Sequence, residues 1–310
     1  MNLTKALSNL PISKDDIIKA LHMLELTHED IASIGQTENR FVNLLRKYSL
    51  YSESIQQQSV GPFEYSGQSD PHLTRLRENF NLDTIAGKGS EIERLCNLMQ
   101  WAHNLATHTS AAVKPEKMNS LNLIHLIQTE GKLINCGMFA IILNDIYLSL
   151  GWNSRVIHLK PYKENFRESH VVNSVYCRQL EKWLFFDPNL NAYFMSETGE
   201  ILSVAEVRER FINGSELLVN DELTFNSDNL VFAALGQHYG KDFYLLYIAK
   251  NIFRYNCSEI SNFDDGSGPT RKTLIELLPV GYRSELLSQS SVTKKDYQIT
   301  YTADLSHFWQ

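Results

Sequence analysis

The segment from residue 135 to residue 151 reads NCGMFAIILNDIYLSLG. Apolar side chains occur almost all the way round a helix drawn on this segment, which is typical of a helix buried on most sides. Asn135 is a favourable residue to cap the start of a helix, and Gly151 can adopt the left-handed conformation that often ends one. The segment therefore predicts a buried helix whose first turn contains Cys136.

Three segments typical of β-strands follow this helix, at residues 154–159, 169–177 and 182–187. The last of them ends at Pro188, which cannot donate a ladder hydrogen bond within a central strand. A helix followed by an antiparallel meander is typical of the α+β class, and alternating βαβ units would give a different pattern. We therefore predict an α+β fold.

Periodicity and composition assign the flanking segments. Helices are predicted at 15–25, 39–50, 90–106, 121–129 and 205–212, and strands at 254–257, 273–278 and 297–301. A polar, turn-forming stretch from 52 to 71 has the composition of a linker. The expected division is a helical N-terminal region at 1–65, a core at 66–225 and a C-terminal α/β extension, packed on the core, at 226–310.

The overall composition excludes several classes of protein. With 310 residues, 43% of them hydrophobic and 21% charged, the chain has the average mixture of a globular protein, which argues against disorder. The longest apolar stretch, 138–143, is far too short to span a bilayer. A net charge of −7 argues against nucleic acid as the main partner. No apolar signal core follows Met1, so we expect a cytoplasmic location, or export if a leader has been removed.

The four cysteines are far apart and include no Cys-x-x-Cys pair, which argues against a disulfide scaffold or a zinc ribbon. Cys96 lies on the apolar face of a predicted helix, Cys177 shares a strand face with valines, and Cys257 has no nearby base. These three are expected to be packing residues. Cys136 differs, because backbone N–H groups and the helix dipole stabilise a thiolate at the start of a helix. The alternative for Cys136 is a small residue chosen for tight packing.

A histidine and an aspartate follow Cys136 at suggestive positions. His170 begins the second predicted strand and Asp187 ends the third. If these strands form an antiparallel hairpin, the beginning of one lies beside the end of the other. Taken singly, His170 could be an ordinary strand-edge residue and Asp187 a turn former before proline. Taken together, they provide the base and the orienting carboxylate that a thiol nucleophile needs.

At these residues the sequence resembles the transglutaminase-like superfamily of papain-type thiol enzymes, and in particular its uncharacterised bacterial members. The matching segments are NCGMFA at 135–140, HVVNSVY at 170–176 and WLFFDPN at 183–189. The resemblance covers roughly residues 80 to 200. It implies a papain-like core in which the cysteine-bearing helix packs on an antiparallel sheet.

The resemblance also implies roles for individual residues. Cys136 would be the nucleophile, His170 its acid–base partner and Asp187 the residue that orients the histidine. The backbone N–H of Cys136 would stabilise the oxyanion, while Trp101 and Gln128 remain open as second donors. No cofactor or metal is expected. The chain cannot hold the long flanking domains of calcium-dependent transglutaminases, and no loop has the spacing of a calcium site.

The expected activity is cysteine-dependent hydrolysis of an amide bond, or acyl transfer, through a thioester. Its substrate would be a peptide, a protein or another amide; the oligomeric state stays open. Two alternatives remain. The chain could be a binding module that keeps the fold without turnover, or Cys136, His170 and Asp187 could bind zinc.

Overall fold

The computed structural model describes residues 13–52, 62–266, 272–288, 291–293 and 297–310. The segment after Met1, in which no signal core was found, and part of the predicted linker therefore lie outside the described residues. Among the described helices, none combines the length and the apolar character needed to cross a membrane.

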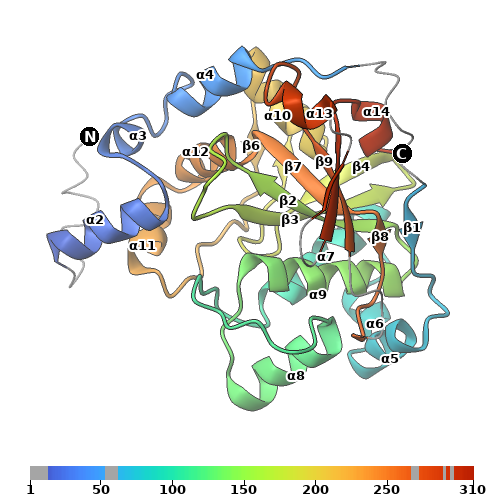
Figure 1. Ribbon diagram of the computed structural model, residues 1–310. Coiled ribbons are helices and arrows are strands. Elements are labelled where there is room, and N and C mark those ends of the chain that lie inside the picture. The colour runs from blue at the N-terminus through green and yellow to red at the C-terminus, as the bar shows by residue number, and fades with distance from the viewer. Residues whose placement is uncertain (1–12, 53–61, 267–271, 289–290, 294–296) are drawn as a thin grey trace.

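A seven-stranded sheet forms the centre of the molecule (Figure 1). Its strand order is β10-β11-β9-β7-β2-β3-β4. The strands are β2 (Ser154–Lys160), β3 (His170–Cys177), β4 (Lys182–Phe186), β7 (Arg254–Ser258), β9 (Lys272–Leu277), β10 (Ser291–Thr293) and β11 (Tyr297–Thr302). Neighbouring strands are antiparallel except β9 and β11, which are parallel. The predicted α+β class and the meander β2-β3-β4 are thus confirmed.

The predicted buried helix is α9 (Cys136–Ser149), which packs on β2 and β3. The side chain of Asn135 accepts a hydrogen bond from the Met138 N–H and caps the helix, as predicted. Gly151 has a φ angle of 87°, which is the left-handed conformation expected after the helix end. Local sequence signals therefore placed both ends of this helix correctly.

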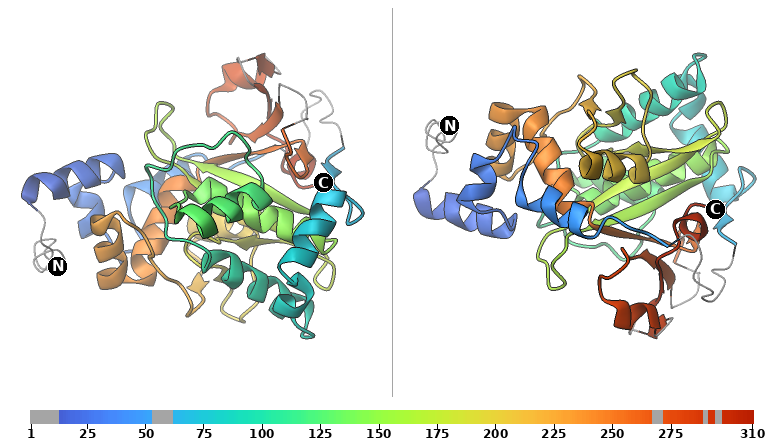
Figure 2. Two further views of the ribbon diagram at one scale, coloured as in Figure 1. Left: turned by 90° about the horizontal axis from the view of Figure 1, so that it is seen from below. Right: turned by 90° about the horizontal axis from the view of Figure 1, so that it is seen from above.

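Helices cover both faces of the sheet because alternate strand residues point to opposite sides. Val175 packs with α9, whereas Val172 packs in a second core on the other face. The helices on the α9 side are α5 (Pro71–Asn79), α6 (Leu82–Ala86), α7 (Glu91–His103) and α8 (Ser120–Glu130). Those on the other side are α2 (Lys14–Met23), α3 (His28–Ala32), α4 (Arg40–Lys47), α10 (Val204–Asn213), α11 (Leu230–Tyr239) and α12 (Lys241–Asn251). Figure 2 shows the two helical layers from below and from above.

The predicted linker contains structure that its composition did not indicate. Strand β1 (Glu64–Tyr65) pairs in parallel with β8 (Ile260–Ser261), nearly two hundred residues later in the chain. Two further short strands, β5 (Phe194–Met195) and β6 (Leu218–Val219), pair with each other. Strands of two residues have no readable periodicity, and their pairing depends on distant partners.

The division into three regions stays a prediction. One hydrophobic core contains Leu45, Val172 and Tyr255, which come from all three predicted regions. The chain ends with α13 (Ser284–Ser288) and α14 (Leu305–Phe308), next to β11.

Candidate active site

Cys136 is the first residue of α9 and is partly exposed. The first N–H groups of a helix have no carbonyl partner within it, and the dipole makes this end positive. Asn135 satisfies Met138, which leaves the Cys136 and Gly137 N–H groups without a partner inside the helix. A negative charge on the sulfur, or on an oxygen close to it, is therefore stabilised at this position.

His170 is the first residue of β3 and is fully buried. It pairs with Leu159 of β2, while Asp187 directly follows β4 on the other side of β3. The Nε2 atom of His170 lies 2.6 Å from Oδ2 of Asp187. Side chains 17 residues apart thus meet, because β3 and β4 form the antiparallel pair expected for these segments.

Asp187 has one oxygen for the turn and one for the histidine. Its Oδ1 accepts hydrogen bonds from the N–H groups of Asn189 and Leu190, at 3.1 and 3.2 Å. Its Oδ2 accepts a hydrogen bond from the Tyr244 hydroxyl at 3.0 Å, besides its contact with His170. The same carboxylate therefore bonds the turn through Oδ1 and the histidine through Oδ2.

The pKa values of Cys136 and His170 favour an ion pair between the sulfur and the imidazole. Burial alone would lower the pKa of His170, but the charge and hydrogen bond of Asp187 raise that pKa to about 10. Burial would raise the pKa of Cys136, but hydrogen bonds with His108 and His170 outweigh it and lower the pKa to about 7. Between these two values the thiolate and the imidazolium coexist.

Tyr247 of α12 completes the surroundings of the imidazole. The Tyr247 hydroxyl lies 3.4 Å from Nδ1 of His170, and the two rings meet edge to face with centroids 5.1 Å apart. The same hydroxyl donates a short hydrogen bond to Glu168, which also pairs with Lys250. The position of the His170 ring is thus restrained by Asp187 on one side and by α12 on the other.

His108 is a site residue that the sequence did not indicate. Its imidazole lies close enough to Cys136 to help lower the pKa of the thiol, and its Nδ1 lies 3.2 Å from the Ser227 hydroxyl. Its backbone is held between Ile134 and Ser227 by single β-bridges. The residue lies in a polar loop without periodicity, so no local signal distinguished it from the other histidines.

The two side chains left open as second oxyanion donors have ordinary surroundings. Trp101 packs in the α9-side core, with its ring 5.5 Å from that of Phe80. Gln128 is exposed on α8. His108 is therefore the better candidate for that role.

The other three thiols lie in surroundings that disfavour a thiolate. Burial raises the pKa of Cys96 and of Cys257 to about 12. Burial also raises the pKa of Cys177, whose sulfur donates a hydrogen bond to Glu91. Their surroundings agree with the packing role expected for them, and Cys136 alone among the four has a lowered pKa.

A cavity of about 830 Å³ is lined by Gly137, the residue after Cys136, while Cys136 itself is not part of the lining. It follows α9 from Gly137 past Ile141 to Asp145, and its floor includes Val156 and His158 of β2. A search of the described residues found no group of three or more His, Cys, Asp or Glu side chains suited to hold a metal ion.

Comparison with known proteins does not identify this site. No family model matches the chain, and no curated protein matches it. One solved structure, of a protein from Cytophaga hutchinsonii provisionally described as a cysteine protease, shares 15% sequence identity with a TM-score of 0.30. The match covers 52% of this chain and 49% of that one, so this chain spans about half of that protein. A likeness this low assigns neither a fold nor an activity to the chain.

Proposed function

We propose that this protein is a thiol hydrolase or acyltransferase that acts on amide bonds through Cys136, His170 and Asp187. The observation that carries the proposal is the contact of a partly exposed sulfur, at the positive end of α9, with a buried imidazole that is paired with a carboxylate. A nucleophile, a proton donor and an orienting group are the three parts of a catalytic triad.

In the first half of the proposed reaction, the Cys136 thiolate attacks the carbonyl carbon of the substrate. A carbon–sulfur bond forms, and the carbonyl electrons move to oxygen. The His170 imidazolium then gives its proton to the leaving nitrogen, the carbon–nitrogen bond breaks, and a thioester remains on Cys136. Asp187 accepts the hydrogen bond of the imidazolium and stabilises it throughout.

In the second half, neutral His170 takes a proton from water or from a second amine, which attacks the thioester. The carbon–sulfur bond breaks, and the thiolate and the imidazolium return. Attack by water gives hydrolysis and attack by an amine gives acyl transfer. We favour hydrolysis of a peptide or another amide over protein cross-linking.

Two donors are proposed to stabilise the oxyanion. One is the backbone N–H of Cys136, at the positive end of α9. The other is the imidazole of His108, which contacts the sulfur and is oriented by Ser227. When the sulfur attacks a carbonyl carbon, the carbonyl oxygen develops negative charge, and we expect the His108 imidazole to lie close to that oxygen.

The competing function is a binding module that keeps these residues without turnover. The most direct test is a screen of peptides, glutamine amides and cell-wall fragments with the wild type and Cys136→Ala. We expect turnover of at least one class by the wild type and none by Cys136→Ala. Cys96→Ala is the matched control and should retain activity, since Cys96 is a packing residue. Turnover that survives in Cys136→Ala would refute the proposed nucleophile.

Alkylation provides a test that needs no substrate. With iodoacetamide, Cys136 should react well below pH 8, and its rate should rise with a midpoint near pH 7, following its lowered pKa. Cys96 and Cys177 should stay protected in the native protein because burial raises their pKa values. Mass spectrometry of tryptic peptides measures each site. Equal labelling of all four thiols would favour the binding module.

A pair of substitutions at His108 extends the same test. His108→Gln keeps an N–H donor, whereas His108→Ala removes it, so turnover should fall about a hundredfold more in the alanine variant. His108→Ala should shift the alkylation midpoint of Cys136 upward, and His108→Gln should shift it less, because His108 lowers the pKa of the thiol mainly as a hydrogen-bond donor. If both variants turn over substrate equally, His108 is not the oxyanion donor.

A further inference from the structure

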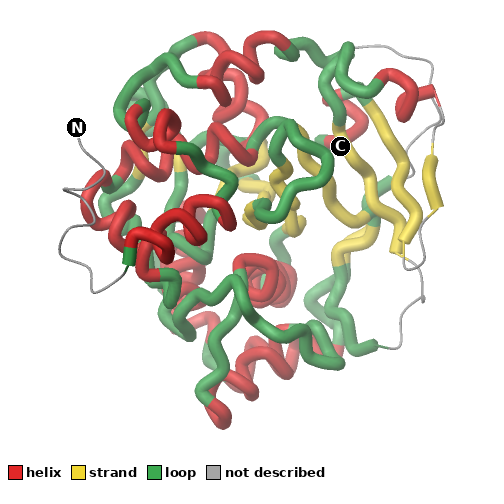
Figure 3. The backbone as a smooth tube through the Cα atoms, turned by 60° about the vertical axis from the view of Figure 1, so that its left-hand side comes forward, coloured by secondary structure: helices red, strands yellow, loops and turns green. Residues whose placement is uncertain are grey.

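A second cavity lies on the α9 face of the sheet, beyond the strands that α9 covers. Its volume is about 450 Å³, and its floor is formed by β2, β7, β9 and β11. Figure 3 shows several strands at one side of the molecule, where few helices lie. Two loops form its walls, one between β2 and β3 and the other between β9 and α13.

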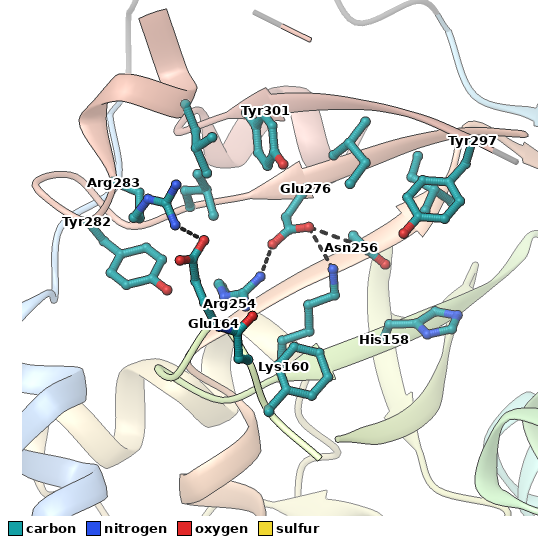
Figure 4. A pocket seen from close by; sticks show the side chains of 16 residues that line it. His158, Lys160, Glu164, Arg254, Asn256, Glu276, Tyr282, Arg283, Tyr297 and Tyr301 are labelled. Atoms are coloured by element: carbon teal, nitrogen blue, oxygen red, sulfur yellow. Dashed lines mark hydrogen bonds and ion pairs between the residues drawn. The ribbon is translucent and has the colours of Figure 1, made fainter. Parts of the chain in front are cut away.

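A buried carboxylate lies at the centre of this cavity (Figure 4). Glu276 is 2% exposed, and its Oε2 lies 2.7 Å from Nζ of Lys160 and 3.3 Å from Nδ2 of Asn256. Its Oε1 accepts a short hydrogen bond from Arg254. Both oxygens of Glu276 are therefore engaged, and a cationic ligand would have to displace one of these partners.

The charged groups that face the cavity have a positive balance. Lys160, Arg254 and Arg283 carry three positive charges, against two negative charges on Glu164 and Glu276. The remaining titratable groups are three tyrosines and His158, whose pKa is lowered to about 4 by desolvation and by Lys160, so that the imidazole is neutral at pH 7. Charge balance in this partly enclosed place therefore favours an anion as occupant.

Arg254 has donor capacity that the protein does not use. It is 7% exposed, and its Nε has no hydrogen-bond partner among the described residues. An unpaired buried donor costs stability, and guanidinium groups suit the planar fork of a carboxylate. Arg283, on the opposite wall, pairs with Glu164 and with Glu285, which lies outside the lining, and it is only partly buried.

Apart from Asn165, the rest of the lining is apolar or aromatic. Leu274 and Ile299 face each other across β9 and β11, flanked by Tyr297 and Tyr301. In Figure 4 Tyr297 and His158 lie at the end of the cavity away from Arg283. A ligand with a charged head and a ring or apolar body matches this division, and the volume falls within the range of small-molecule sites.

We propose that this cavity binds a small organic carboxylate with a ring or apolar body, its carboxylate held between Arg254, Lys160 and Arg283. The site does not depend on the activity proposed for Cys136. The two cavities share His158 and Leu274, so the carboxylate could belong to the substrate of Cys136 or to a separate molecule. The chemistry that recognises it is the same in both cases.

Calorimetric titration with N-acetyl-L-phenylalanine and with its uncharged amide tests the proposal. The carboxylate should bind at one site per chain and at least tenfold more tightly than the amide, because only the carboxylate forms charge-assisted hydrogen bonds. Arg254→Gln and Arg283→Gln should each weaken binding of the carboxylate by about tenfold. Arg283→Gln is informative even if Arg254→Gln fails to fold, since Arg283 is partly exposed.

Lys163→Gln is the matched control. It removes one positive charge from the same β2–β3 loop, but Lys163 is exposed and does not line the cavity. Equal affinity for carboxylate and amide, or equal weakening by Lys163→Gln and Arg283→Gln, would overturn the proposal.

A second arm distinguishes the two sources of the carboxylate. It repeats the titration on protein in which Cys136 has been alkylated. The alkylating reagent carries the acyl part of a substrate found in the screen. Loss of carboxylate binding would show that the substrate itself occupies the cavity, whereas retained binding would show a separate ligand. Either result supports the site, and failure of the proposed catalysis would leave the first arm unaffected.

Discussion

His170→Ala is expected to slow alkylation of Cys136 at pH 7 by about fiftyfold. With a pKa near 7, half of the sulfur is thiolate at that pH, whereas an unperturbed thiol with a pKa of 9.0 is about one-hundredth thiolate. Turnover of any substrate found in the screen should fall further, by about 10⁴-fold, because the variant also lacks the proton donor for the leaving nitrogen. Stopped alkylation and steady-state kinetics measure the two effects separately.

His125→Ala is the matched control for His170→Ala. His125 is exposed on α8, so its removal should leave both rates unchanged. Circular dichroism checks that His170→Ala is folded before the rates are compared. Wild-type alkylation by folded His170→Ala would show that the imidazole does not activate the sulfur, and the proposed triad would then have no base.

Asp187→Asn should lower turnover by about 10³- to 10⁴-fold while largely preserving the fold. The amide can still accept hydrogen bonds from the N–H groups of Asn189 and Leu190, but it lacks the charge that raises the pKa of His170. The imidazolium would therefore lose its stabilisation, and the alkylation midpoint of Cys136 should move upward. Kinetics and the pH profile of alkylation measure the two consequences.

Asp187→Ala separates catalysis from stability. It leaves the Tyr244 hydroxyl and two backbone N–H groups without their acceptor in a fully buried place. We expect it to reduce the free energy of unfolding by about 3 kcal/mol or more, compared with a smaller loss for Asp187→Asn. Urea denaturation measures both. If the two variants are equally stable, Asp187 does not hold the turn as described.

The ion pair between His170 and Asp187 also predicts how the free energy of unfolding depends on pH. The folded pKa of His170, about 10, lies above its ordinary value of 6.5. Its contribution to the free energy of unfolding is therefore complete below about pH 6.5 and is lost as the pH rises toward 10. Asp187→Asn should flatten this part of the pH profile.

The sequence by itself determined the parts that depend on near neighbours. The cap at Asn135, the helix that follows it and the end at Gly151 are specified by residues within a few turns of one another. The hairpin of β3 and β4 has a short connection, so the approach of His170 to Asp187 followed from strand boundaries alone. The α+β class followed from the order of these elements.

Only the tertiary structure decided which distant residues join them. His108 meets Cys136 from a loop 136 − 108 = 28 residues earlier, and Tyr247 reaches His170 from a helix 77 residues later. The charges of the second cavity come from strands more than a hundred residues apart, such as Lys160 and Glu276. Hydrophobic periodicity reports which face of an element is buried, but it does not report which other element covers that face. That choice depends on packing among all the elements at once, which is why Cys136, His170 and Asp187 could be proposed from their own elements whereas His108 and Tyr247 could not.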